Sequence, residues 1–296
     1  MNILQTIVLG CALTIHANPA NAYASAETTH YVERNPGRIA YDDSGGNGPV
    51  VIAIPGMGDL RGQYRFLRPR LIHAGYRVIT MDIRGHGDSS VQWSDYSAKA
   101  TAEDALAVMD QLGTDTAFIV GNSFAAGAGL WAARQRPEAI LGVAMIGPIL
   151  RDIPSSPLIK GIVYLGLAGP WRVGFWTTYW DSLFTLNKPS DHAAYRERLV
   201  ANLREEGRMN ALRQMVALSK ADTESIVGKI PVPVLVIMGS RDPDFRDPMG
   251  EAAWLSGKTK GQVAIVQGAG HYPHVELPDL VAGELATFLD RLKGQR

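Results

Sequence analysis

The stretch Gly121-Asn122-Ser123-Phe124-Ala125 follows the apolar run Ala117-Phe118-Ile119-Val120 and precedes a helix-like stretch from Ala126 to Arg134. A strand that passes directly into a helix makes a sharp turn, and a serine at such a turn projects its hydroxyl above the sheet. The flanking residues must be small, as Gly121 and Ala125 are, although the usual pattern has glycine at both positions. The following backbone N–H and the helix N-terminus both favour negative charge on a reacting oxygen. Ser123 is therefore the first candidate for a reactive residue.

Apolar runs alternate with helical patterns on both sides of this turn. We predict helices at 67–74 and from Thr101 onward, where Asp104 three residues later suggests a capping box. Runs that are apolar on both faces and alternate with helices predict an α/β fold, with a mostly parallel central sheet and helices on both faces. The active site then belongs at the carboxyl ends of the strands. The predicted strands are 38–41, 50–54, 77–81, 116–120, 141–146, 232–238 and 262–266.

The stretch from about Gly147 to Lys229 breaks this alternation, and we interpret it as a helical cap inserted after the strand at 141–146. It contains two amphipathic helical patterns, Tyr195 to Leu203 and Met209 to Val216. Its first half is rich in aromatic residues, which either attach the cap to the core or line an apolar pocket over Ser123. These residues are Tyr164, Trp171, Phe175, Trp176, Tyr179, Trp180 and Phe184.

The composition favours a neutral small molecule as the partner. The 296 residues are 46% hydrophobic, enough for one large α/β domain or a core with an insert. Lys plus Arg and Asp plus Glu both number 29, so the bulk charge points to neither nucleic acid nor anionic lipid. The sequence has no zinc pattern, phosphate-binding glycine loop or dinucleotide fingerprint, so we expect no metal and no cofactor. It makes no prediction of the oligomeric state.

The N-terminus differs from the rest of the chain. Ile3 to Ile15 is mostly apolar, and small-x-small cleavage sites follow at Ala20-Asn21-Ala22 and Ala24-Ser25-Ala26. We predict a signal peptide over 1–26 and an exported protein, periplasmic or secreted, with no membrane span once the leader is removed. Because no Lys or Arg precedes the apolar run, a membrane anchor is the alternative. The only cysteine, Cys11, would leave with the leader. The predicted domains are the core at 27–149, the cap at 150–228 and the core again at 229–296.

A serine nucleophile needs a base to take its proton and an acid to orient that base. His271 is the best-placed histidine, in a glycine-rich loop after the strand ending at Val266. The neighbouring His274 competes with it, and its alternative role is to hydrogen-bond loop backbone.

The candidate acid is Asp242, which directly follows the strand 232–238 and so lies on the same rim as the serine. Asp244 and Asp247 are close enough to compete, and their alternative roles are helix capping and solvated loop charge.

Three separated motifs resemble those of serine hydrolases of the α/β-hydrolase superfamily that carry a helical cap. Besides the elbow, Asp82 to Ser89 is similar to the family's Asp-x-Arg-Gly-x-Gly-x-Ser loop, and Gly270 to Pro278 is similar to its Gly-His-x-x-x-x-Glu-x-Pro ending. The resemblance covers residues 30 to 290. It implies that Ser123 is the nucleophile, Asp242 the acid and His271 the base, in the chain order expected for this fold.

The resemblance also implies an oxyanion hole formed by the backbone N–H groups of Phe124 and Met57, the latter in the loop Ile54-Pro55-Gly56-Met57-Gly58-Asp59. Pro55 stands where the family usually has histidine. We interpret His86 as part of a structural tight turn, in a loop held by Arg84 and Asp82.

The expected reaction is hydrolysis of a small, largely apolar ester through an acyl-enzyme. Lactones and amides are alternative substrates, as are carbon-carbon bonds, because Asn122 is also found in relatives that cleave them. A ligand-binding protein with little turnover is a further alternative. An aspartate nucleophile would suggest an epoxide hydrolase or dehalogenase, and Ser123 argues against both.

Overall fold

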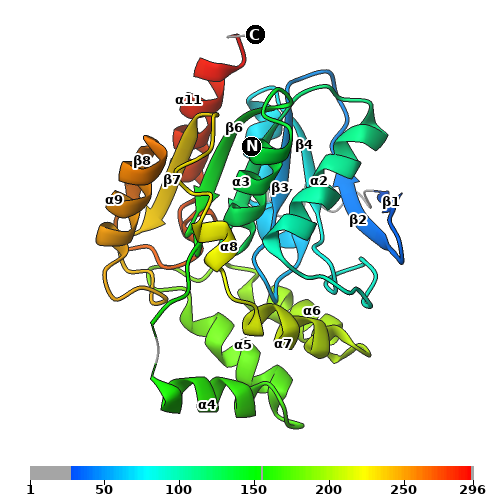
Figure 1. Ribbon diagram of the computed structural model, residues 1–296, viewed down its shortest axis with the longest axis vertical. Helices are drawn as coiled ribbons and strands as arrows, with labels where there is room; N and C mark the ends of the chain where they lie inside the picture. Colours follow the sequence, from blue (N-terminus) through cyan, green and yellow to red (C-terminus); the bar gives the residue numbers. More distant parts are fainter. Residues whose placement is uncertain (1–27, 155, 295–296) are drawn as a thin grey trace, which may run out of the picture.

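A single eight-stranded sheet runs through the part of the chain that the computed structural model describes, residues 28–154 and 156–294 (Figure 1). Its strand order is β1-β2-β4-β3-β5-β6-β7-β8. The first two strands are antiparallel to their neighbours, and every pairing from β4 to β8 is parallel. The strands are β1 (Thr29–Glu33), β2 (Arg38–Asp43), β3 (Val50–Ile54), β4 (Arg77–Met81), β5 (Ala117–Asn122), β6 (Ile140–Ile146), β7 (Val234–Gly239) and β8 (Gln262–Val266).

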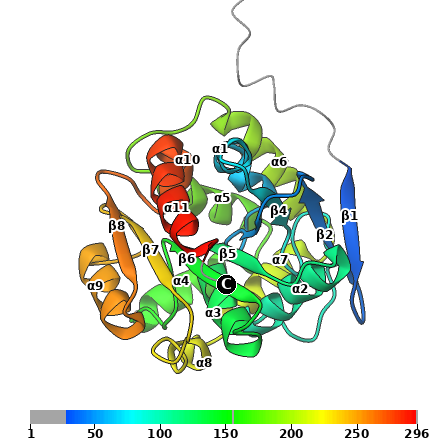
Figure 2. The same cartoon turned by 90° about the horizontal axis from the view of Figure 1, so that it is seen from above.

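Helices cover both faces of the sheet, as the view from above shows (Figure 2). Apolar residues of α2, α3 and α9 form one buried cluster with the strands, and those of α1 and α11 form another on the opposite face. The helices are α1 (Leu67–His73), α2 (Ala98–Leu112), α3 (Ala125–Gln135), α4 (Pro157–Gly166), α5 (Arg172–Ser182), α6 (His192–Arg204), α7 (Arg208–Ala217), α8 (Ala221–Glu224), α9 (Pro248–Thr259), α10 (Pro273–Glu276) and α11 (Pro278–Leu292), with a 3₁₀ helix η2 at Arg61–Arg65.

The predicted fold class is confirmed, and each predicted strand ends within two residues of an observed one. The strand β1 was not predicted. The capping box is wrong: α2 begins at Ala98, and the Ser97 side chain caps it by accepting a hydrogen bond from the Ala100 N–H. Asp104 is instead fully buried and paired with Arg84, because a carboxylate inside the protein must be hydrogen-bonded or paired.

Helices α4 to α8 lie between β6 and β7, and we refer to them with their connecting segments as the cap. The two amphipathic patterns correspond to α6 and α7, and their patterned apolar residues are buried except Val200 and Val216, which are partly buried. They form a third cluster with residues of α5 and with Tyr272 and Val275, which belong to the loop and short helix after β8. The cap therefore packs directly on the segment that carries His271.

Glu276 fastens this segment to the cap. One of its carboxylate oxygens accepts a hydrogen bond from the N–H of Gly270 at 2.6 Å. The other accepts from the backbone N–H groups of Thr185, Leu186 and Asn187, just after α5. An ionised carboxylate forms stronger bonds to N–H donors than a neutral acceptor does. The glutamate of the C-terminal motif thus joins two loops that are far apart in sequence.

The predicted leader, residues 1–26, lies within residues 1–27, outside the described residues, so its cleavage and the export of the protein stay predictions. The boundaries of the three predicted domains stay predictions as well. Among the described residues, no helix has the length and apolar character needed to cross a membrane.

Replacing Glu276 with Gln should lower the free energy of unfolding by about 2–3 kcal/mol, because four backbone donors lose a charged acceptor. Calorimetry should show this as a fall in the melting temperature of about 5 °C. Glu284→Gln, at an exposed position of α11, is the matched control and should leave the melting temperature unchanged. Equal melting temperatures for the two variants would contradict the role given to Glu276.

Candidate active site

Ser123 occupies a tight turn between β5 and α3 in a left-handed backbone conformation, with φ of 57°. Residues other than glycine rarely adopt this conformation, and its strain is found most often at functional sites. Hydrogen bonds on both sides hold it. The Ser123 N–H donates to the carbonyl of Ile146 at 2.8 Å, and the Ser123 carbonyl accepts from the N–H groups of Ala126 and Ile149. The predicted elbow is thus present and tied to the end of the adjacent strand β6.

Two glycines make room for the turn. A Cβ at Gly121 would lie 2.3 Å from the carbonyl oxygen of Ala125, so only glycine fits there. A Cβ at Gly56 would lie 3.2 Å from the Cβ of Ser123, which brings the loop after β3 against the serine. Ala125 itself is fully buried without displacing the turn. The requirement for a small residue is therefore stricter before the serine than after it.

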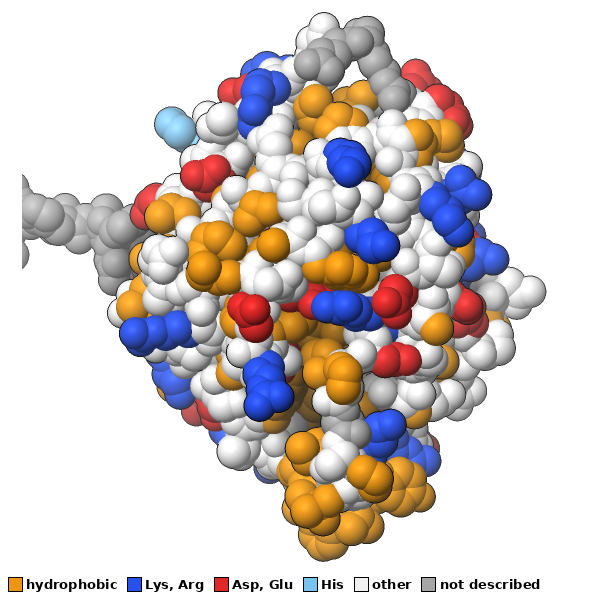
Figure 3. Space-filling model, turned by 60° about the vertical axis from the view of Figure 1, so that its left-hand side comes forward, with side chains coloured by type: hydrophobic (Ala, Val, Ile, Leu, Met, Phe, Trp, Pro, Cys, Tyr) orange, Lys and Arg blue, Asp and Glu red, His pale blue; other side chains and the backbone are white. Residues whose placement is uncertain are grey.

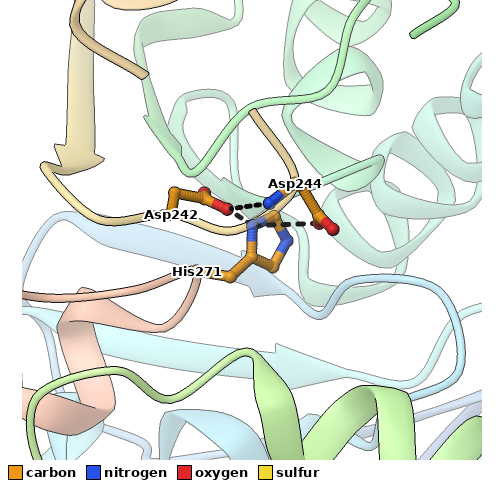
Figure 4. Close-up of side chains that lie close together, drawn as sticks. All are labelled: Asp242, Asp244 and His271. Carbon is orange, nitrogen blue, oxygen red and sulfur yellow. Dashed lines mark hydrogen bonds and ion pairs between the residues drawn. The ribbon is translucent and has the colours of Figure 1, made fainter. Parts of the chain in front are cut away.

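The structure brings Asp242 and His271 together (Figure 4). Asp242 follows β7, His271 follows β8, and the Nδ1 of His271 lies 2.7 Å from the Oδ2 of Asp242. Both side chains are almost completely buried. A carboxylate facing Nδ1 holds the proton there, which leaves Nε2 free to accept a proton in the neutral ring.

A second carboxylate, Asp244, faces the same ring nitrogen. Its Oδ2 lies 3.4 Å from the Nδ1 of His271, and its Oδ1 accepts a 2.7 Å hydrogen bond from the hydroxyl of Tyr179 in the cap. The expected role of Asp244 as a cap or solvated charge is wrong, because its side chain is mostly buried beside His271. Asp247 does cap a helix, accepting a hydrogen bond from the N–H of Gly250 at the start of α9. The spacing Asp242-Pro243-Asp244 was the available sequence signal.

The two carboxylates determine the charge of His271. Burial alone would lower the pKa of its imidazole, but Asp242 and then Asp244 outweigh burial and raise the pKa to about 9. Burial raises the pKa of Asp244, and the negative charge of Asp242 adds to this effect. His271 is therefore cationic at neutral pH and becomes a base as the pH rises towards 9.

His274 is fully buried, and the structure pairs it with Gln63, whose Nε2 lies 3.0 Å from the imidazole Nε2. Burial and the nearby His271 lower the pKa of His274 to about 3. Gln63 also donates to the side chain of Asn122, which itself donates to the carbonyls of Ile146 and His271. These three side chains form a polar layer that joins the turn at Ser123 to the loop of His271.

The loop after β3 is held by groups from other elements. The N–H of Gly56 donates to Gln63, and the N–H of Gly58 donates to the Nε2 of His86 at 2.9 Å. Burial lowers the pKa of His86 to about 4, so its ring stays neutral and can accept this bond. The hydrogen bonds found among residues 28–154 and 156–294 use neither the N–H of Met57 nor that of Phe124. His86 thus supports the loop in which Pro55 replaces the usual histidine.

Comparison with known proteins identifies the family. The family model described as alpha/beta hydrolase fold matches residues 49–278. The chain belongs to this family. Among solved structures, a bromoperoxidase from Bacillus anthracis has a TM-score of 0.77 and 22% identity, covering 89% of this chain and 100% of that one. A thermophilic esterase from Thermogutta terrifontis has a TM-score of 0.74 and 22% identity, covering 90% and 99%. At this identity the likeness shows the fold of the α/β hydrolases.

Among curated relatives, epoxide hydrolase B from Mycobacterium tuberculosis is 34% identical over 139 residues. The match covers 43% of this chain and 39% of that protein, so the chain spans about two fifths of this relative's length. This match agrees with membership of the α/β-hydrolase family. The activity of this chain belongs to the proposal below.

Like Glu276, the buried carboxylate of Asp59 binds the cap to the α/β-hydrolase core. Asp59 lies in the loop after β3. Asp59 accepts hydrogen bonds from the hydroxyl of Tyr195 at 2.6 Å, the indole N–H of Trp180 at 3.1 Å and the N–H of Leu60 at 2.8 Å. Burial raises its pKa, although these donors oppose the effect. Sequence reasoning missed this residue, because its partners lie more than a hundred positions away in the chain.

The cap aromatics of this α/β hydrolase differ in exposure, and Phe175, Tyr179 and Phe184 are partly buried against the cap cluster. Trp176 and Trp180 are buried and donate to Gly58 and Asp59, so they attach the cap to the core. Tyr164 and Trp171 are exposed and do neither of the two things expected of this stretch.

A cavity of about 590 Å³ opens beside the cap, between the segment that follows β6 and the loop before α9. Its lining includes Ile153, Pro154, Asp244 and Phe245, so it reaches the carboxylate next to His271.

Asp242, Asp244 and His271 also carry possible metal-ligand atoms within 4.8 Å of one another. A cation bound through the Nδ1 of His271 would displace the proton shared with Asp242, so it would compete with the hydrogen bond described above.

Replacing Asp244 with Asn should lower the pKa of His271 from about 9 towards its ordinary value, because one of two charges facing the ring is removed. Titration of labelled histidine by NMR, with His271→Gln to assign the signal, measures the pKa directly. Asp247→Asn keeps a good N-cap at an exposed position and should leave the pKa of His271 unchanged. An unchanged pKa in Asp244→Asn would show that Asp244 has no electrostatic effect on the ring.

Proposed function

We propose that the protein is a serine hydrolase that cleaves a small, largely apolar carboxylic ester through an acyl-enzyme. The observation that carries this proposal is the left-handed Ser123 at the end of β5, on the same rim as the hydrogen-bonded pair of His271 and Asp242. A strained serine on a turn above a parallel sheet is the arrangement in which an alcohol becomes an accessible nucleophile.

In the proposed mechanism, the hydroxyl of Ser123 attacks the ester carbonyl while the Nε2 of His271, in its neutral form, accepts the proton. Asp242 holds the proton on Nδ1 and stabilises the imidazolium that forms. The N–H groups of Met57 and Phe124 donate to the oxyanion, Phe124 from the N-terminus of α3. His271 returns the proton to the leaving alcohol, and a water activated by the same imidazole then releases the acid.

The serine at position 123 favours ester hydrolysis over epoxide opening, although curated relatives are named as epoxide hydrolases. An epoxide hydrolase would use an aspartate at this turn, and the chain has a serine. A fully buried Asn122, bonded to the carbonyls of Ile146 and His271, serves to position the turn. It therefore gives no separate support to carbon-carbon cleavage. Lactones and amides use the same groups and remain alternative substrates.

A fluorophosphonate probe should label the wild-type protein at Ser123, and p-nitrophenyl esters should be hydrolysed. Ser123→Ala should abolish labelling and lower kcat by at least about 10³-fold, because the remaining groups cannot form the acyl-enzyme. Ser225→Ala, at a serine exposed on the surface, is the matched control and should behave as wild type. Equal ester turnover by Ser123→Ala and wild type would exclude the proposed nucleophile.

The same panel separates the alternatives. Lactones, anilides and epoxides are offered beside the esters, with products identified by mass. Diol formation from an epoxide that survives Ser123→Ala would support the chemistry named for the relatives. Tight binding of a ligand with no product over hours would support a binding protein instead.

A further inference from the structure

Helix α4 exposes an apolar surface at the far end of the cap. Figure 1 shows it at the end of the molecule away from the sheet, and Figure 3 shows hydrophobic side chains gathered on this projection. Leu158 is 73% exposed, Ile162 52% and Leu165 62%. A helix on the surface of a soluble protein normally turns polar residues outward. Four exposed side chains of α4 are aliphatic, those of Leu158, Ile159, Ile162 and Leu165, so this surface is suited to an apolar partner.

The charge of the surrounding segment is one-sided. From Ile153 to Trp180 the sequence has no Asp or Glu, and its only charged residues are Lys160 and Arg172. This local excess of cations is hidden in the balanced charge of the whole chain. Apolar side chains accompanied by cations, with no carboxylate among them, match the interface of an anionic lipid layer.

Two exposed aromatic residues lie at the C-terminal end of α4. Tyr164 is on the helix, and Trp171 donates its indole N–H to the carbonyl of Leu165 at 3.0 Å, which holds the ring beside the helix end. Tyrosine and tryptophan are enriched where apolar and aqueous phases meet, because each has an apolar body and a polar group. Their position at the rim of an aliphatic surface is that of an interfacial anchor.

We propose that α4 docks on an anionic lipid surface, with its aliphatic side chains in the interfacial layer and Lys160 near the headgroups. A ten-residue helix is about 15 Å long, which is half the thickness of the hydrocarbon core, so α4 lies in the interface and does not cross it. A projecting helix enters a fluid lipid layer without a matching surface, whereas a second protein copy would need a complementary groove. Lipid is therefore the favoured partner.

The segment that leads into α4 also lines the cavity that reaches Asp244. Ile153 and Pro154 line that cavity, and α4 begins at Pro157, three residues further on. A docked α4 would hold this segment, which forms one wall of the cavity, near the lipid layer. The inference that esters dissolved in lipid are the substrate class rests on the proposed ester hydrolysis, whereas lipid binding by α4 does not.

Binding is measured by sedimentation with vesicles of phosphatidylcholine mixed with phosphatidylglycerol, using the full chain. The wild type should sediment with them, and Leu158→Ser, Ile162→Ser and Leu165→Ser combined should lower binding at least about tenfold. The matched control combines Met249→Ser, Val263→Ser and Leu280→Ser, which are exposed apolar positions outside the cap. It should bind as wild type. The emission of Trp171 should shift to the blue on binding, and Trp171→Phe should remove the shift.

Three outcomes overturn the proposal. The first is no binding by the wild type, and the second is equal binding by the α4 and control variants, which would assign the binding to another segment. The third is a wild-type dimer that becomes a monomer in the α4 variant, with neither binding vesicles.

Activity is measured separately. A water-soluble p-nitrophenyl ester should be hydrolysed equally by wild type and the α4 variant, and a long-chain ester embedded in vesicles more slowly by the variant. Loss of vesicle binding with no hydrolysis of either ester would support docking and refute the proposed reaction.

Discussion

The left-handed backbone of Ser123 is the constraint on which the rest of the site depends. Such a conformation costs about 1–3 kcal/mol and persists only where neighbouring structure holds it. Here the carbonyl of Ile146 on β6 accepts the serine N–H, and the missing side chains of Gly121 and Gly56 leave room for the turn. Because β5 lies between β3 and β6, the register of three parallel strands determines where the hydroxyl stands. The packing of the sheet thus holds Ser123 in its strained conformation.

Buried carboxylates connect this rigid core to the cap. A carboxylate inside a protein must be hydrogen-bonded or paired, so each one fixes the position of its donors. Asp59 binds α5 and α6, and Glu276 binds both the segment after α5 and the N–H of Gly270, next to His271. Tyr179 of α5 binds Asp244, which faces the ring of His271. Placement of the cap and the electrostatic surroundings of His271 are therefore coupled through the same side chains.

The sequence predicts the parts of this arrangement that are encoded locally. Strands buried on both faces are recognisable as apolar runs, and residues at their carboxyl ends share a rim, so Asp242 and His271 could be expected to meet. The role of Asp59 could not be predicted, because its side-chain partners Trp180 and Tyr195 come from the cap. Loop conformation likewise decides that Asp244 faces His271 whereas Asp247 caps α9. In the sequence, the aromatic residues of the cap cannot be told apart by exposure. Only the structure shows that Trp180 is buried whereas Trp171 is exposed.

Helix α4 is tied to the site through α5. Gly166, at the end of α4, packs so closely on Phe175 of α5 that an added Cβ would lie 2.5 Å from the ring, and Leu167 is buried in the cap cluster. A ten-residue helix is marginal in water by itself, so contacts along its length decide how well it is ordered. A lipid layer that covers its aliphatic side would add such contacts. The ordering would act first on α5, the helix whose Tyr179 holds the second carboxylate against His271.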